Sequence, residues 1–391
     1  MKLFLDNFIA EGGQGAHHRA TALVRQRLRL TIDAARVYRA HTTDSTHSRV
    51  VAVKKLHTTK HVRNPVLRHE ACVMIVLQGH PAIPEVYAWG RSQYFEYLAL
   101  EELGQDLTTL SPLTLHNLVV LTCQLLDAVQ FIHAHHIVHC DIKPSNVLFQ
   151  RHPSGVVKLI DFGMAKLYRD PTTLQHRPQT SLRWMHGTKG FASINVHYHI
   201  RPSRRDDIES LSYTVLSLLC GGLPWLDHDA ENADVVRLKV MWSGAALGYG
   251  YPPVFGEFLD YARSLRFDQE PAYKEWRKRF KAVMSEITEP PRFSVSDTRN
   301  RLRPATWASL AHHTHIPTPP SSIAEDAVGG SNDMFSPTSP WYGPVNIPDE
   351  DLVGDEKRLV STSLGHIDEV PGMKRACIYV FLGKDERMVA E

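Results

Sequence analysis

The hydrophobic and polar positions of the chain first follow a period of two. In RLRLTID, residues 27–33, three apolar side chains fall on one face of an expected strand: Leu28, Leu30 and Ile32. The runs ARVYRAH and RVVAVKKL follow, with the polar turn HTTDSTHS between them, and AIPEVYAWG and FEYLALEEL come later. These runs predict a small antiparallel sheet.

The period then changes to that of a helix. In LRHEACVMIVLQGH four apolar residues recur at helical spacing: Leu67, Ala71, Met74 and Ile75. Long helical segments follow residue 104, among them NLVVLTCQLLDAVQFIHAHH, which is apolar enough for a core helix. The pattern predicts an α+β fold with two lobes. A sheet-rich lobe with one main helix covers residues 27–103, and a larger helical lobe covers 104–286.

The two ends of the chain have a different character. Residues 1–26 show no clear period and include the loop-like EGGQGAHH, so we expect a loose N-terminal extension. Residues 287–391 are rich in Pro, Ser and Thr, a low-complexity composition that predicts a disordered tail. The Ser-Pro pairs in FSPTSPW suggest regulatory phosphorylation there, with an inert solvated tail as the alternative.

Composition narrows the class of protein. The 391 residues are 43% hydrophobic, which is enough for a sizeable core, and the net charge of +2 implies no affinity of the whole chain for polyanions. Five scattered cysteines without a C-x-x-C pair suggest free thiols in a reducing compartment. No long apolar run resembles a secretory signal or a membrane span. We expect an intracellular monomer, cytoplasmic or nuclear, that binds neither nucleic acid nor membrane.

Phosphoryl transfer needs groups that position the phosphates, hold metal ions and orient the acceptor hydroxyl. In VAVK, residues 51–54, Ala52 and Lys54 share one face of a strand, which places a small residue beside an adenine and a cation beside phosphates. Glu70 follows 16 residues later on the predicted helix and could pair with Lys54. Each residue alone is more simply interpreted as a solvated surface charge.

HCDIKPSN, residues 139–146, supplies the next groups. Asp141 would orient the acceptor hydroxyl, Lys143 would neutralise the transferred phosphate, and Asn146 would hold a Mg²⁺ ion. Fifteen residues after Asn146, Asp161 opens a D-F-G motif and would bind the Mg²⁺ that bridges the phosphates. The two motifs at this spacing, with Lys54 and Glu70 upstream, predict a kinase that uses ATP and Mg²⁺. Lys143 at this position favours Ser or Thr as the acceptor.

With these motifs the chain resembles the eukaryotic protein kinases, and residues 187–225 narrow the resemblance to the casein kinase I family. Ser193-Ile194-Asn195 stands where most kinases have A-P-E, and SRRDDIES and LPW follow. YARSLRFDQEPAYKEWRKRF, residues 261–280, also matches. The similarity covers about residues 27–285 and implies a bilobal protein-kinase fold.

The resemblance also implies roles for residues at matching positions. Five of them would line the adenine slot: Val37, Ala52, Leu100 as the gatekeeper, Leu103 at the hinge, and Leu148. Thr188 would steady Asp141 and Lys143, and Asp207 would brace the catalytic loop from beneath.

The chain departs from the family pattern at the glycine-rich loop. The stretch Leu30–Tyr38, where the family has G-x-G-x-x-G, contains no glycine, and Ala35 stands at the third position. Such glycines let backbone amides approach the phosphates closely. EGGQG at residues 11–15 could be a displaced loop, but it ends 39 residues before Lys54 with a strand pattern between, which disfavours that interpretation. We therefore expect weak binding of ATP.

Two further departures concern regulation and substrate. Cys140 replaces an arginine that normally pairs with a phosphorylated activation segment, so activity should not require that phosphorylation. Gly190 replaces an arginine that binds a phosphate on the substrate, although Lys189 is adjacent. The segment between Met164 and Arg205 remains strongly basic, with Asp170 as its one acid before Arg205. An acidic or pre-phosphorylated substrate is therefore expected.

The interpretation that follows is an ATP-dependent Ser/Thr protein kinase of the casein kinase I type. The alternative is a weak or inactive pseudokinase that acts as a protein-binding scaffold, which the missing glycines and Gly190 favour. A third and weaker alternative is an error of gene prediction within residues 1–46 that removed the true loop.

Overall fold

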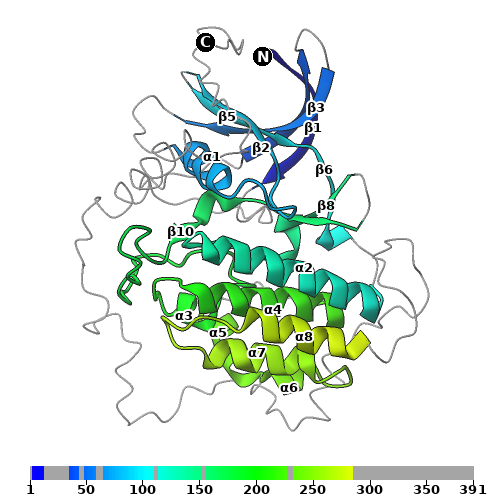
Figure 1. Cartoon of the computed structure of the whole chain (residues 1–391), viewed down its shortest axis with the longest axis vertical. Coiled ribbons are helices and arrows are strands. Elements are labelled where there is room, and N and C mark those ends of the chain that lie inside the picture. Colours follow the sequence, from blue (N-terminus) through cyan, green and yellow to red (C-terminus); the bar gives the residue numbers. More distant parts are fainter. Residues whose placement is uncertain are drawn as a thin grey trace, which may run out of the picture.

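The computed structural model describes residues 2–12, 35–43, 48–58, 65–92, 94–109, 113–151, 155–226 and 232–284. Figure 1 shows a sheet with one helix stacked on a larger helical body, with short strands at the junction. The described part is thus the predicted two-lobed α+β arrangement. The expected strand at 28–33 and the expected tail at 287–391 lie outside the described residues.

The smaller lobe is built on a five-stranded antiparallel sheet. Its strands lie in the order β1 (Lys2–Gly12), β2 (Ala35–Thr43), β3 (Ser48–His57), β5 (Phe95–Glu101) and β4 (Val86–Arg91). The alternation in β3 has a direct result, because Val51 and Val53 are fully buried while Lys54 faces the opposite side.

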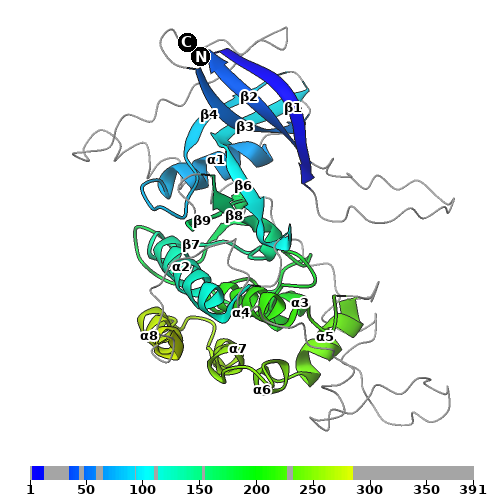
Figure 2. The ribbon, with the colours of Figure 1, turned by 90° about the vertical axis from the view of Figure 1, so that its right-hand side faces the viewer.

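Strand β1 corrects the prediction of a loose extension over residues 1–26. Residues 2–12 pair with β2 along its whole length, from Lys2 opposite Thr43 to Gly12 opposite Ala35. The smaller lobe therefore begins at residue 2 and not at residue 27, and β1 forms the edge of the sheet in Figure 2. The pairing also places Gly12 at the end of β1, opposite Ala35 at the start of β2.

Helix α1 (Val66–Val76) packs against this sheet. Leu67 and Ala71 on the helix are buried against Leu98 on β5 and Leu56 on β3. Glu70 lies on the same side of the helix and is buried as well. The helix thus presents one carboxylate to the sheet.

The junction between the lobes carries short strands. A three-stranded sheet joins β6 (Leu103–Asp106), β8 (Val147–Gln150) and β9 (Val157–Leu159), and β7 (Ile137–Val138) pairs with β10 (Lys166–Leu167). Single 3-10 turns cover Leu107–Thr109, Pro144–Asn146 and Phe162–Met164. The predicted catalytic segments therefore lie in the loops that leave β7 and β9.

The larger lobe is helical. Its helices are α2 (Leu115–Ala134), α3 (Ile194–His197), α4 (Arg204–Cys220), α5 (Asn232–Met241), α6 (Gly244–Leu247), α7 (Val254–Ser264) and α8 (Tyr273–Val283). Thr114 caps α2 by accepting a hydrogen bond from the Asn117 amide at 3.1 Å. Ser203 and Asp206 form a capping box at the start of α4.

Helix α2 is apolar because it lies in the core of this lobe. By length and mean hydropathy it is the one helix within the described ranges that could cross a membrane, but 61% of its most apolar window is buried. It packs against α8 and α4 (Figures 1 and 2). Core helices of soluble proteins pass the same test, so α2 is weak support for a membrane span.

Candidate active site

Lys54 joins three elements at the centre of the molecule. Its Nζ lies 2.8 Å from Glu70 Oε2 and 2.9 Å from Asp161 Oδ1. Burial alone would lower the pKa of Lys54, but the two carboxylates outweigh it and raise the pKa. Burial raises the pKa of Glu70, and Lys54 counteracts this effect. The predicted pair between Lys54 and Glu70 is thus formed.

Asp161 stays accessible next to a buried neighbour, Phe162. The Phe162 side chain is fully buried, with its ring centroid 4.7 Å from that of His139. The backbone of Asp161 is left-handed, with φ 66° and ψ 65°, and its side chain is 41% exposed. Burial would raise the pKa of Asp161, but Lys54 holds it below its usual value. The result is an ionised carboxylate that stays accessible.

Asp141 is fixed by hydrogen bonds to both carboxylate oxygens. Oδ1 accepts from the amide and the hydroxyl of Thr188, both at 2.8 Å. Oδ2 accepts from Lys143 Nζ at 2.8 Å and from Asn146 Nδ2 at 3.2 Å. Lys143 also donates to Thr188 Oγ1 at 2.6 Å. The structure thus brings together four of the predicted residues, and Thr188 contacts both Asp141 and Lys143 as expected.

Gly187 lets the segment with Thr188 approach the catalytic loop. Its φ is +82°, and a Cβ atom at this position would lie 2.5 Å from the carbonyl oxygen of Cys140. A side chain would therefore meet both backbone strain and a clash. Gly187 is a residue that the motif analysis did not single out.

Asp207 braces the catalytic loop from α4, as the family resemblance implied. Its carboxylate accepts from the amides of His139 at 2.7 Å and Cys140 at 2.9 Å. His133 Nε2 lies 2.8 Å from the same carboxylate, and its Nδ1 lies 2.6 Å from the Tyr273 hydroxyl. Burial alone would raise the pKa of Asp207, but the bond to His133 lowers it. The loop therefore rests on an ionised and fully bonded group.

Asn146 and Asp161 fit the metal-binding role predicted for them. Asn146 Nδ2 donates to the Asp141 carbonyl oxygen at 2.9 Å, which leaves the amide oxygen as its ligand atom. Within the described ranges no three His, Cys, Asp or Glu side chains form a metal site by themselves. This is the usual situation for Mg²⁺, which takes most of its ligands from phosphates and water.

The five residues predicted for the adenine slot come from both lobes. Val37 on β2 is paired with Lys54, and Ala52 on β3 is paired with Leu100 on β5. Leu103 and Leu148 lie on the paired strands β6 and β8. All five side chains are half-buried, in contrast to the fully buried residues beside them. Their contact with a nucleotide stays a prediction.

Cys140 and Gly190, which depart from the family pattern, both pack against neighbouring residues. Cys140 is half-buried, its Sγ lies 3.7 Å from the Val138 carbonyl oxygen, and burial raises the pKa of its thiol well above the usual value. It is thus an unreactive thiol. A Cβ atom at Gly190 would lie 2.5 Å from Leu226 Cδ2, so Leu226 occupies the space that a side chain there would need.

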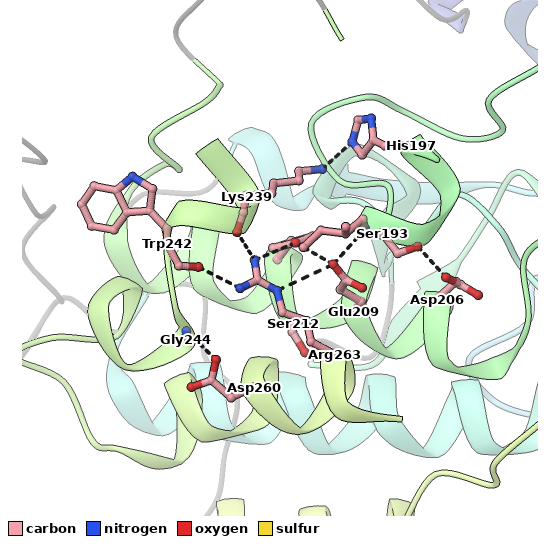
Figure 3. A network of polar contacts seen from close by, with 12 residues as sticks. Ser193, His197, Asp206, Glu209, Ser212, Lys239, Trp242, Gly244, Asp260 and Arg263 are labelled. Atoms are coloured by element: carbon pink, nitrogen blue, oxygen red, sulfur yellow. Dashed lines mark hydrogen bonds and ion pairs between the residues drawn. The ribbon is translucent and has the colours of Figure 1, made fainter. Parts of the chain in front are cut away.

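A polar network that the sequence did not reveal anchors Ser193-Ile194-Asn195 (Figure 3). Ser193 donates to Asp206 at 2.5 Å, and the Ile194 amide donates to Glu209 Oε1 at 3.0 Å. Arg263 on α7 lies 3.8 Å from Glu209 and donates to the Lys239 carbonyl oxygen at 2.7 Å. Helix α4 thus supplies a glutamate that ties Ser-Ile-Asn to α7, in a segment that lacks the glutamate of A-P-E.

Arg204 and Arg205 make contacts within the larger lobe. Arg205 lies 3.8 Å from Asp206, whereas Arg204 stacks over the Tyr168 ring at 4.7 Å and donates to the Asp268 carbonyl oxygen at 2.6 Å. These two arginines therefore contribute little to a substrate-binding charge.

Comparison with known sequences agrees with this geometry. The family model of the protein kinase domain matches residues 33–252, more than half of the chain, so the chain belongs to the protein kinase family. It is a casein kinase I-like member: over 251 residues it is 35% identical to Casein kinase I homolog 2 of Schizosaccharomyces pombe. That match covers 61% of this chain and 57% of the relative, so the chain spans little more than half of the relative's length.

Proposed function

We propose that this protein transfers the γ-phosphate of Mg²⁺-bound ATP to Ser and Thr hydroxyls of proteins. The observation that carries the proposal is the bridge from Lys54 to both Glu70 and Asp161, at 2.8 and 2.9 Å. In protein kinases both the lysine–glutamate pair and the D-F-G aspartate must be in place for catalysis. Both are in place here, and the relative's name supports the same activity.

The chain's own residues would divide the work in a simple way. Lys54 would hold the α- and β-phosphates, and Asp161 and Asn146 would hold the metal ions that neutralise the transferred group. Asp141 would orient the acceptor hydroxyl, because its carboxylate is already held by Thr188, Lys143 and Asn146. Lys143 would donate to the phosphate in flight.

Strand β1 supports the binding of ATP. Weak binding was expected because the loop was sought between residues 30 and 38, where the sequence has no glycine. In the sheet, however, the strand that pairs with β2 from the N-terminal side of the chain is β1. At its end the sequence reads AEGGQG, residues 10–15, which keeps the second and third glycines of G-x-G-x-x-G. Residues 13–15 lie outside the described part of the chain, so this assignment is part of the proposal.

Basic residues of the segment after β10 support an acidic substrate. Arg183 and Lys189 are exposed on either side of Gly187, close in sequence to Thr188. Positive charge there would attract acidic residues around an acceptor hydroxyl. We also propose an intracellular monomer, which the free thiols of Cys72, Cys123, Cys140 and Cys220 support.

The function is tested in two steps with the full chain. A thermal-shift assay with ATP, with and without Mg²⁺, measures nucleotide binding, and transfer of labelled γ-phosphate to casein measures activity. We expect a metal-dependent rise in Tm and labelled casein. Binding without transfer would instead support the scaffold alternative. The absence of both binding and transfer would contradict the proposed function.

A further inference from the structure

The ammonium group of Lys239 lies inside the larger lobe. Lys239 is on α5 and is 0% exposed. Its Nζ donates to the carbonyl oxygens of Ala192 at 2.7 Å and Lys189 at 2.9 Å, and it lies 3.1 Å from His197 Nε2. Figure 3 shows the Lys239 side chain reaching from α5 toward His197 on α3.

Each proton of this ammonium has an acceptor. His197 Nδ1 lies 2.6 Å from Asn232 Oδ1, so Nδ1 carries the proton and Nε2 accepts from Lys239. The ammonium also lies 4.7 Å from the centre of the Tyr213 ring. Burial lowers the pKa of Lys239, and the charge of the Glu209 carboxylate partly opposes this lowering.

A buried charge adds little to protein stability, because a protein with an apolar side chain of similar volume in its place is often as stable or more stable. The ammonium orients backbone groups that an apolar side chain could not bind. It draws two carbonyl groups of one short segment, residues 188–193, to a single point on α5. The Trp225 indole nitrogen donates to a third carbonyl of that segment, at Gly190, at 2.8 Å.

The same segment orients Asp141. Thr188 is bonded to Asp141 through its amide and its hydroxyl, and the amides of Phe191 and Ala192 donate back to the Thr188 carbonyl at 2.9 and 2.8 Å. We propose that Lys239 is a positioning residue for phosphoryl transfer: it fixes residues 188–193, and through Thr188 it fixes the carboxylate of Asp141. The inference rests on the proposed function and deepens it.

The test compares Lys239→Met, which keeps an unbranched side chain of similar size, with Lys274→Met on the exposed face of α8. Wild type and variants are assayed for kcat, for KM of ATP and of casein, and for amide hydrogen exchange in residues 188–197. For Lys239→Met we expect kcat to fall about tenfold or more with KM for ATP unchanged, because misplacing a catalytic group slows chemistry. Exchange should rise in residues 188–197 and stay unchanged in α7 and α8. Lys274→Met should match wild type in all readouts.

Wild-type kcat in folded Lys239→Met protein, or exchange that rises equally throughout the larger lobe, would overturn the proposal. If Lys239→Met does not fold, His197→Leu removes one acceptor and leaves the two carbonyl bonds. His197→Leu should show the same local rise in hydrogen exchange and a smaller fall in kcat. If both hydrogen exchange and kcat stay at their wild-type values, the proposal is overturned. If the wild-type protein transfers no phosphate at all, the proposed function fails, and hydrogen exchange alone then decides the role of Lys239.

Discussion

The ammonium of Lys54 lies between two carboxylates, 2.8 Å from Glu70 and 2.9 Å from Asp161. The three residues come from β3, from α1 and from the loop after β9. Glu70 follows Lys54 by 16 residues and Asp161 follows it by 107. One cation therefore connects the sheet, its helix and the D-F-G segment of the larger lobe. In the proposed function, nucleotide binding and metal binding would both depend on this contact.

Replacing Glu70 with Gln should reduce activity without unfolding the protein. The amide cannot balance the charge of Lys54, which is then drawn to Asp161 alone and away from the phosphates. We expect kcat/KM for ATP to fall about tenfold or more, equivalent to about 1.4 kcal/mol of transition-state stabilisation. Glu275→Gln, on the exposed side of α8, is the matched control. Equal kcat/KM in the two variants would show that the pair has no role in catalysis.

Deleting residues 1–26 should damage the smaller lobe. The deletion removes β1 and leaves β2 paired only with β3, so that the backbone groups on the other edge of β2 lose their partner strand. We expect a lower Tm and loss of the Tm shift with Mg-ATP. A chain ending at residue 286 is the control, since it removes a longer stretch without touching any described element. An unchanged Tm in the N-terminal deletion would mean that β1 is not part of the folded lobe.

Two glycines with the same φ separate backbone strain from steric clash. Gly187 and Gly250 both have φ +82°, but a Cβ atom would clash with the Cys140 carbonyl only at Gly187 and would meet open space at Gly250. We expect Gly250→Ala to lower stability by about 1 kcal/mol with normal kcat. Gly187→Ala should lower stability further and abolish transfer, because the catalytic loop must move. Chemical denaturation and casein phosphorylation measure the two effects, and similar behaviour of both variants would contradict this explanation.

His197 should make stability depend on pH. Burial and the neighbouring Lys239 lower the pKa of His197 from 6.5 to about 4. Between these values the unfolded chain binds more protons than the folded one, so stability falls as the pH drops from 6.5 to 4, by about 3 kcal/mol at most. His197→Gln keeps an oxygen acceptor near Lys239 and does not titrate. Between pH 7.5 and 5, wild-type Tm should therefore fall more than that of the variant; parallel curves would show that His197 does not contribute.

The arrangement of the candidate catalytic residues could be predicted because these residues lie close together in short segments of the chain. Asp141, Lys143 and Asn146 lie within six residues, and in the structure Lys143 and Asn146 both donate hydrogen bonds to the Asp141 carboxylate. The strand and helix patterns assigned Lys54 and Glu70 to their elements, and the motifs at residues 139–146 and 161–163 favoured a pair over two surface charges. The bracing role of Asp207 came only from the family resemblance.

Strand β1 was missed because its pattern is irregular. The pairing of β1 with β2 shifts register between Leu5 and Asn7 and again between Phe8 and Ala10. Each shift interrupts the alternation of period two, so KLFLDNFIA does not look like a strand. Lys239 was missed for a different reason. Nothing near it in the sequence distinguishes a buried lysine from a surface one, because its acceptors are supplied 42 to 50 residues earlier.

Transfer of labelled γ-phosphate from Mg-ATP to casein, by the full chain and by Asp161→Asn, tests the central claim most directly. The substitution keeps the size of the side chain and removes the carboxylate that Lys54 contacts and that would bind the metal. We predict that the wild-type protein labels casein and that Asp161→Asn, with a comparable Tm, labels it at least about a hundredfold more slowly. A folded wild-type protein that labels no casein, or a variant that labels it at the wild-type rate, would contradict the account.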